Sequence, residues 1–191
     1  MLSVPKIFTP VLAVDDDEGL LLSIKASLFA AGMPEPAVVS DSTKVMEVVE
    51  ANSFRVVLLD LIMPHVGGIE LLKKIKNQYP HIECIITTAV EDANTAVQAM
   101  KFGAFDYLIK PILQEKLLIA IKNALEKYDL RQNLNLYERH PTFSELKHPN
   151  VFEEIVARDQ AMALVFHQAE TYGYNDYRSE EHTSELQSLL I

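Results

Sequence analysis

The sequence has a single cysteine, Cys84, among its 191 residues, so no disulfide can form within the chain. One isolated thiol is typical of a reducing compartment, and we expect a cytoplasmic location. Cys84 lies in the apolar run IECIITT, where we interpret it as a small buried hydrophobic residue. No stretch approaches the roughly 20 apolar residues of a membrane helix, and the N-terminus lacks the features of a secretory signal.

Positive charge is also scarce. The chain has 17 lysines and arginines against 27 aspartates and glutamates, which gives a formal net charge of -10. Binding to the phosphates of a nucleic acid requires clustered Lys and Arg. We therefore expect this chain to make no direct contact with nucleic acid, and we expect none with a membrane.

Two glycine-rich nucleotide-binding motifs are absent. No Gly-x-Gly-x-x-Gly follows the first expected strand, which disfavours a dinucleotide-binding fold. No Gly-x-x-x-x-Gly-Lys-Ser/Thr occurs, so the chain has no P-loop.

What the sequence does have is a regular alternation of short β-type runs and amphipathic helical stretches. This pattern predicts an α/β fold, a parallel sheet wrapped by helices. The first helix should turn Leu20, Ile24, Leu28 and Ala31 inward, and a long helix is expected from about residue 114 to 137. The expected strands span residues 11–14, 37–40, 55–60, 82–88 and 106–110.

Five polar side chains stand at the carboxyl ends of four of these strands. Ligands of open parallel sheets bind just beyond this edge. Asp60, at the end of the third strand, is the expected nucleophile for a phosphoryl group. Clustered carboxylates predict a Mg²⁺ ion, which prefers oxygen ligands, and a lysine and a hydroxyl can hold phosphoryl oxygens. The five residues are Asp15, Asp16, Asp60, Thr88 and Lys110.

Four motifs together resemble the receiver domain of bacterial two-component response regulators. They are VDDD at 14–17, LLDLIMPHVGG at 58–68, TTA at 87–89 and GAFDYLIKP at 103–111. The resemblance covers residues 7–128 and implies a doubly wound, flavodoxin-like (βα)5 fold with strand order 2-1-3-4-5. It also implies that a partner histidine kinase phosphorylates Asp60, and that slow self-dephosphorylation takes the place of enzymatic turnover.

The resemblance assigns further roles residue by residue. Asp15, Asp16, Asp60 and the backbone carbonyl of Ile62 would bind Mg²⁺. Thr88, which precedes Ala89, would be the switch hydroxyl rather than Thr87, and Tyr107 the aromatic switch. Phosphorylation would bias the surface of the fourth helix, fifth strand and fifth helix, which could form a homodimer together with the linker helix.

One departure concerns the turn after Met-Pro. Many receivers carry Asp-Gly where this chain has Gly67 and Gly68. Two glycines still supply turn flexibility, but the missing acid leaves the cap of the following helix in doubt.

Three segments follow the receiver-like part. Residues 129–150 are expected to form a dimerising linker helix and a polar linker. Residues 151–173 resemble the start of the AAA+ ATPase domain of nitrogen-regulator-type transcription activators, with an ordinary amphipathic helix as the alternative. Residues 178–191 resemble a translated sequencing adapter, so we interpret the chain as an activator that was cut short.

Two other functions fit parts of this pattern. Haloacid-dehalogenase-like phosphohydrolases also form an aspartyl phosphate beside Mg²⁺, but they place a second acid two residues after the nucleophile, where this chain has Ile62. A pseudo-receiver that only binds partners is the second alternative, and the intact set of acids disfavours it.

Overall fold

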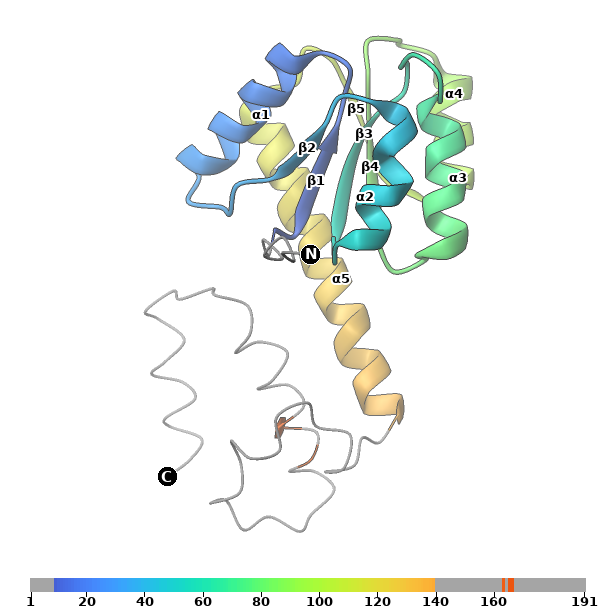
Figure 1. The fold of residues 1–191 in the computed structure, drawn as a ribbon. Coiled ribbons are helices and arrows are strands. Elements are labelled where there is room, and N and C mark those ends of the chain that lie inside the picture. Colours follow the sequence, from blue (N-terminus) through green and yellow to red (C-terminus); the bar gives the residue numbers. More distant parts are fainter. Residues whose placement is uncertain (1–8, 140–162, 164, 167–191) are drawn as a thin grey trace, which may run out of the picture. The chain divides into compact units, whose positions relative to one another are not determined.

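The computed structural model describes residues 9–139, 163, 165 and 166, and its centre is a five-stranded parallel sheet (Figure 1). The sheet has the predicted order β2-β1-β3-β4-β5. Its strands are β1 Val11–Val14, β2 Ala37–Val39, β3 Val56–Asp60, β4 Glu83–Thr88 and β5 Ala104–Ile109. The helices are α1 Glu18–Ala30, α2 Val45–Ala51, α3 Gly68–Gln78, α4 Ala93–Lys101 and α5 Gln114–Arg139, with a short 3₁₀ helix η1 at Ser42–Lys44.

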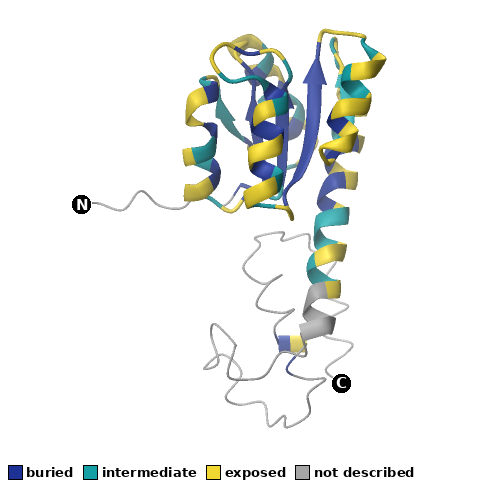
Figure 2. Ribbon diagram, turned by 90° about the vertical axis from the view of Figure 1, so that its right-hand side faces the viewer, coloured by how far each residue is buried: buried dark blue, intermediate teal, exposed yellow. Residues whose placement is uncertain are grey.

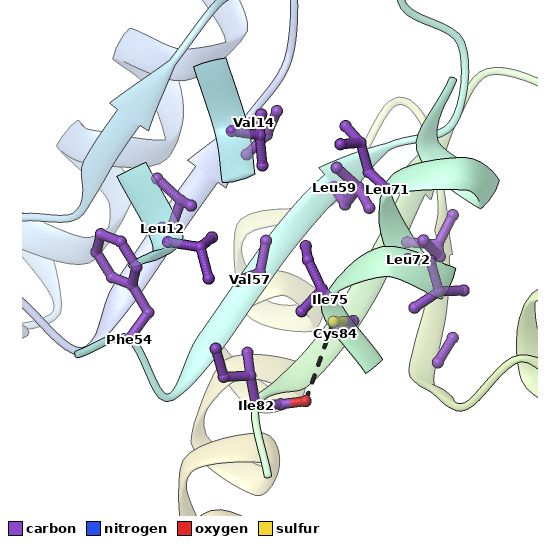
Figure 3. Packing of buried hydrophobic residues seen from close by; sticks show 14 of the residues in the cluster. Leu12, Val14, Phe54, Val57, Leu59, Leu71, Leu72, Ile75, Ile82 and Cys84 are labelled. Carbon is purple, nitrogen blue, oxygen red and sulfur yellow. Dashed lines mark hydrogen bonds between the residues drawn. The ribbon is translucent and has the colours of Figure 1, made fainter. Parts of the chain in front are cut away.

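Helices cover both faces of the sheet, α1 and α5 on one side and α2, α3 and α4 on the other (Figure 1). Successive residues of a strand point to opposite faces, so each strand serves two cores. In β3, Val57 and Leu59 pack with Leu72 and Ile75 of α3, as Figure 3 shows. Leu58 of β3 instead joins the cluster formed with α1 and α5. The three inner strands β1, β3 and β4 are accordingly buried along their whole length, whereas the edge strands β2 and β5 are mostly partly buried. The helices expose their outer faces (Figure 2).

The sequence located the first strand and the start of the last helix correctly, but it erred in the inner face of α1. Leu21, Ile24 and Leu28 are buried, whereas Ala31 is exposed and lies beyond the helix end at Ala30. Leu20 is partly buried and packs against the same core cluster, as predicted. The helix ends early because Gly32, with φ 69°, turns the chain away from helical geometry.

Cys84 in β4 confirms the prediction of a buried hydrophobic residue. It is 0% exposed and lies among the apolar side chains of Figure 3. Burial raises the pKa of its thiol to about 12. The thiolate is therefore disfavoured, and Cys84 contributes packing rather than reactivity.

The turn between β3 and α3 explains the pair Gly67-Gly68. A Cβ on Gly68 would lie 2.1 Å from the backbone oxygen of Asp60, so only glycine fits there without a shift of the backbone. Close approach, rather than the expected turn flexibility, is therefore the reason for this glycine. Gly67 is the N-cap of α3 and provides no side-chain hydrogen bond, as the missing acid predicts.

Helix α5 packs on the sheet through its first half. Ile121 and Leu125 are buried there, and Leu118 is partly buried, as the sequence pattern predicts. Further along, Leu130 and Leu134 are exposed. No helix in the described part of the chain is both long and apolar enough to cross a bilayer.

Residues 1–131 form one compact unit and residues 132–191 a second. The polar linker at 140–150 and the adapter-like tail at 178–191 lie outside the described residues. Of the segment 151–173, only Ala163, Val165 and Phe166 are described, in helical conformation.

Candidate functional site

The carboxyl ends of the strands bring three acidic side chains together, as the sequence predicts. Asp15 follows β1 directly, and Asp60 is the last residue of β3. Oxygens of Asp15, Asp16 and Asp60 lie within 4.8 Å of one another. Asp15 and Asp60 are buried, while Asp16 is exposed, so the cluster opens to solvent on one side.

Lys110, the residue after β5, joins the two buried acids. Its Nζ atom lies 2.6 Å from Asp15 Oδ2 and 2.6 Å from Asp60 Oδ1. Its backbone N–H donates to the carbonyl of Thr88, 2.7 Å away, which fixes the lysine beside the end of β4. One positive charge therefore faces three carboxylates in this part of the structure, and the cluster keeps an excess of negative charge.

Backbone groups orient each buried carboxylate. The Asp17 N–H donates to Asp15 Oδ1 and the Ile62 N–H to Asp60 Oδ2, both at 3.0 Å. Asp17 itself caps α1, because its carboxylate accepts from the N–H groups of Gly19 and Leu20. The Asp17 carboxylate therefore serves as the N-cap of α1, and the acidic cluster of the site consists of Asp15, Asp16 and Asp60.

The charges of the site are perturbed by burial and by one another. Burial raises the pKa of Asp60 above its ordinary value, and its bond with Lys110 opposes this shift without cancelling it. Burial alone would lower the pKa of Lys110, but its hydrogen bonds to Asp15 and Asp60 outweigh burial and raise it. A desolvated carboxylate next to a fixed ammonium group is typical of sites that carry chemistry.

Thr88 and Tyr107 contact the same residue, Val90, rather than the acids themselves. The Thr88 hydroxyl accepts a hydrogen bond from the Val90 N–H at 3.1 Å. The Tyr107 hydroxyl donates to the Val90 carbonyl, also at 3.1 Å. Thr87, not Thr88, is the residue that pairs with Asp60 in register. Val90 could not be identified from its side chain, because it takes part through its backbone N–H and carbonyl.

The donor set suits a small hard cation. Carboxylate oxygens are ligands that Mg²⁺ prefers, and three of them converge within 4.8 Å. The side chain of Ile62 is 61% exposed beside this cluster, two residues after Asp60. The position that holds a second acid in the phosphohydrolases is therefore apolar here and open to solvent.

Comparison with known proteins is consistent with this geometry. The family model of the response regulator receiver domain matches residues 11–122. An NtrX-like response regulator of Rickettsia typhi (strain ATCC VR-144 / Wilmington) is 36% identical over 129 residues, which are 66% of this chain and 27% of that protein. The DNA-binding transcriptional regulator NtrC of Escherichia coli (strain K12) is 31% identical over 156 residues, 82% of this chain and 31% of that protein.

Solved structures agree with the sequence comparison. A response regulator receiver domain protein from Clostridium thermocellum superposes with a TM-score of 0.60 at 38% identity, covering 64% of this chain and 98% of that one. The beryllofluoride-activated NtrC4 receiver domain dimer matches with a TM-score of 0.59 at 34% identity, covering 62% and 97%. The chain spans between a quarter and a third of the length of these two curated relatives.

Proposed function

Because this chain belongs to the response regulator receiver domain family of two-component signalling, we propose that it acts as a phosphoacceptor in which Asp60 is the modified residue. The observation that carries the proposal is the placement of Lys110 Nζ 2.6 Å from both Asp15 and Asp60, within the cluster of three acids. Asp60 lies at the centre of this arrangement, and Lys110 can hold an oxygen of an incoming phosphoryl group.

We propose that Asp15, Asp16, Asp60 and the Ile62 carbonyl hold a Mg²⁺ ion. Bound there, the ion supplies positive charge that offsets the charge on the phosphoryl oxygens. The excess of negative charge around Lys110 supports this assignment, because a divalent cation relieves the repulsion among the acids.

The transfer reaction follows from the position of Asp60. A carboxylate oxygen of Asp60 attacks the phosphorus of a phosphohistidine on the partner kinase, and a new O–P bond forms. The N–P bond breaks, its electron pair returns to the imidazole, and that ring takes a proton from solvent. The Ile62 N–H, which donates to Asp60 Oδ2 at 3.0 Å, keeps the carboxylate oriented during the attack.

We propose that the signal leaves the site through Thr88 and Tyr107. The phosphoryl group would draw the Thr88 hydroxyl from the Val90 N–H, and Tyr107, bonded to the Val90 carbonyl, would respond. The equilibrium between two alternative packings of α4, β5 and α5 would then shift toward one of them. Exposed apolar side chains on these elements support an interface there, among them Val97, Ile109 and Ile119.

A homodimer is the proposed consequence of this change. The NtrC4 receiver that resembles this chain is described as a dimer in its beryllofluoride-activated form. We propose that this chain pairs through α4, β5 and α5, and through the linker helix that continues α5. The exposed Leu130 and Leu134 in the second half of α5 support the linker contact.

The output of the whole protein is proposed from its relatives. The match to NtrC covers 156 residues and so extends beyond the receiver. This extent supports residues 151–173 as the opening of an AAA+ domain in a transcription activator. In this proposal the adapter-like residues 178–191 are foreign to the native protein.

Labelling with a small phosphodonor tests the proposed function, and two further measurements test the two alternatives. The purified chain is incubated with acetyl phosphate and Mg²⁺, and the phosphoryl group is located by mass spectrometry. We expect stoichiometric labelling of Asp60, and none in Asp60→Asn. Labelling of the variant would refute the acceptor assignment, sustained multiple turnover of small esters would favour a phosphohydrolase, and failure to bind beryllofluoride with Mg²⁺ would favour a pseudo-receiver.

A further inference from the structure

Ser42, the first residue of η1, contacts the loop that follows the acceptor strand. Its side chain is buried, and it has two hydrogen bonds to residues more than 20 positions away. The hydroxyl donates to the Pro64 carbonyl at 2.5 Å and accepts from the Val66 N–H at 3.1 Å. The cap of η1 is the neighbouring Asp41, so Ser42 is free of that role.

The two loop groups that Ser42 contacts lie on either side of a backbone position that side chains rarely adopt. His65 has φ 68°, in the left-handed region. The Val66 N–H also donates to the Pro64 carbonyl at 2.8 Å, which closes a three-residue turn around His65. Turns of this kind are rare and strained, and they persist where surrounding contacts hold them. Ser42 supplies such contacts from outside the loop, at both ends of the turn.

The same loop carries groups of the proposed metal site. It leaves β3 at Asp60, and its early residue Ile62 stands two positions before Pro64. The loop is closed at its base, where the Gly68 N–H donates to the Leu61 carbonyl at 3.0 Å. Between the base and the turn, the Ile62 N–H holds Asp60 Oδ2. A displacement of Pro64 would therefore be passed to Ile62 and to the carboxylate that it orients.

We infer that Ser42 is a positioning residue for the phosphoacceptor site, which it serves by fixing the turn at His65 and thereby the Ile62 backbone. This inference rests on the proposed function. It assigns Ser42 no contact with the metal or the phosphoryl group. Its effect is on how well the loop is arranged before either of them binds.

The test is a Mg²⁺ titration of the full chain by isothermal calorimetry, with metal alone and no phosphodonor. Ser42→Ala removes two hydrogen bonds, but they act on the metal site only through the loop. The loss of Mg²⁺ affinity should therefore correspond to one hydrogen bond, about 0.5–1.5 kcal/mol or about two- to tenfold. Labelling by acetyl phosphate should slow at low Mg²⁺ and recover at saturating Mg²⁺. Ser42→Thr, which keeps the hydroxyl, should restore most of the affinity.

Thr9 provides the matched control. It is also buried, and its hydroxyl donates to the Glu35 carbonyl at 2.7 Å, just before β1 and thus at the opposite edge of the sheet. Thr9→Val should lower stability without changing Mg²⁺ affinity. Wild-type affinity in Ser42→Ala, or equal losses in both variants, would overturn the role of Ser42.

Two further results separate this inference from the proposed function. If Ser42→Ala does not fold, Ser42→Cys gives a weaker donor at the same position, and an affinity equal to the wild type would count against the inference. Labelling of Asp60→Asn would instead refute the acceptor assignment itself. Asp60 labelling that persists alongside an unaltered Ser42→Ala affinity would leave the proposed function standing and remove only the role of Ser42.

Discussion

Lys110 Nζ lies 2.6 Å from Asp60 Oδ1, yet burial dominates the titration of this carboxyl group and raises its pKa. The lysine works in the opposite direction and holds the pKa lower than burial alone would. In the metal-free protein, Asp60 should therefore titrate above 3.8, the ordinary value for aspartate. Lys110→Ala should move its midpoint to still higher pH. Carboxyl ¹³C NMR measures both, and Asp92, whose pKa its bonds with Thr95 lower, should not move.

The same shift predicts how stability depends on pH. A carboxyl group with a raised pKa binds its proton more tightly in the folded state, so its contribution is fully present below pH 3.8. That contribution is lost as the pH rises through the folded pKa of Asp60. The free energy of unfolding of the wild type, minus that of Asp60→Asn, should therefore fall across this window. A difference that rises with pH there would contradict the assigned burial effect.

Ile62 places an apolar side chain two residues after the acceptor, where the phosphohydrolases carry their general acid or base. Ile62→Glu would place a carboxylate two residues after Asp60, on a side chain that is 61% exposed. Positioned general bases contribute about 10²–10⁴-fold, and an unoptimised one should shorten the lifetime of the phosphorylated protein by about tenfold. The lifetime is measured by the release of phosphate after the donor is removed.

Leu22→Glu is the control for the added charge. Leu22 lies on α1, is 68% exposed and likewise changes from a branched aliphatic residue to glutamate. Its phosphorylated form should decay at the wild-type rate. Equal lifetimes for Ile62→Glu and the wild type would show that the missing base does not set the lifetime.

Gly68 and Gly67 form a natural pair for testing the turn beneath the site. The Cβ of Gly68→Ala would lie 2.1 Å from the Asp60 backbone oxygen, so β3 and α3 must separate. Overpacking of this kind costs about 1–3 kcal/mol in the free energy of unfolding, which urea denaturation measures. A Cβ added at Gly67 would lie 4.0 Å from its nearest neighbouring atom. Gly67→Ala should therefore keep a free energy of unfolding near that of the wild type, because the loss of a favourable N-cap residue is offset by a less flexible unfolded chain. Similar losses in both variants would contradict the close approach.

Much of the fold and the acidic cluster could be predicted because each depends on local patterns. Strand β3 is continuously apolar up to Asp60, and the ends of parallel strands meet at one edge. The inner face of α1 was harder, because Leu20 and Leu21 are adjacent and only the packing decides between them. Ala31 was misplaced for a related reason, since helix ends depend on the turn at Gly32.

Contacts between distant residues could not be predicted in the same way. From the sequence, either Asp41 or Ser42 could cap the helical segment that follows β2. Asp41 is the cap, whereas the Ser42 hydroxyl contacts a loop more than 20 residues away. The left-handed backbone of His65 could not be predicted, because histidine, although enriched in this region, adopts it at only a small share of its positions. The role of Val90 depends on its backbone alone and has no side-chain signal.

Glu83 is a further long-range case, located at the start of β4 and thus opposite the acidic cluster. Its side chain is 1% exposed and contacts three cations, Lys76 at 3.5 Å, Lys127 at 3.2 Å and Arg131 at 2.8 Å. Removal of one partner of a buried ion pair typically costs about 3–5 kcal/mol, since the other charge stays buried. Here Lys127 and Arg131 keep contact with solvent, so Glu83→Gln should lower the free energy of unfolding by about 2–3 kcal/mol.

Glu70→Gln distinguishes burial from charge as the cause of this loss. Glu70 pairs with Lys74 at 2.7 Å, a shorter distance than any in the Glu83 cluster, but both side chains are about half exposed. Exposed pairs contribute only about 0.2–1 kcal/mol, so this variant should stay near the wild type in urea denaturation. If Glu83→Gln were equally mild, the three cations would be solvated well enough to need no buried partner. Helix α5 would then be held to the sheet by the apolar contacts of its first half, with Ile121 and Leu125 as the residues to test.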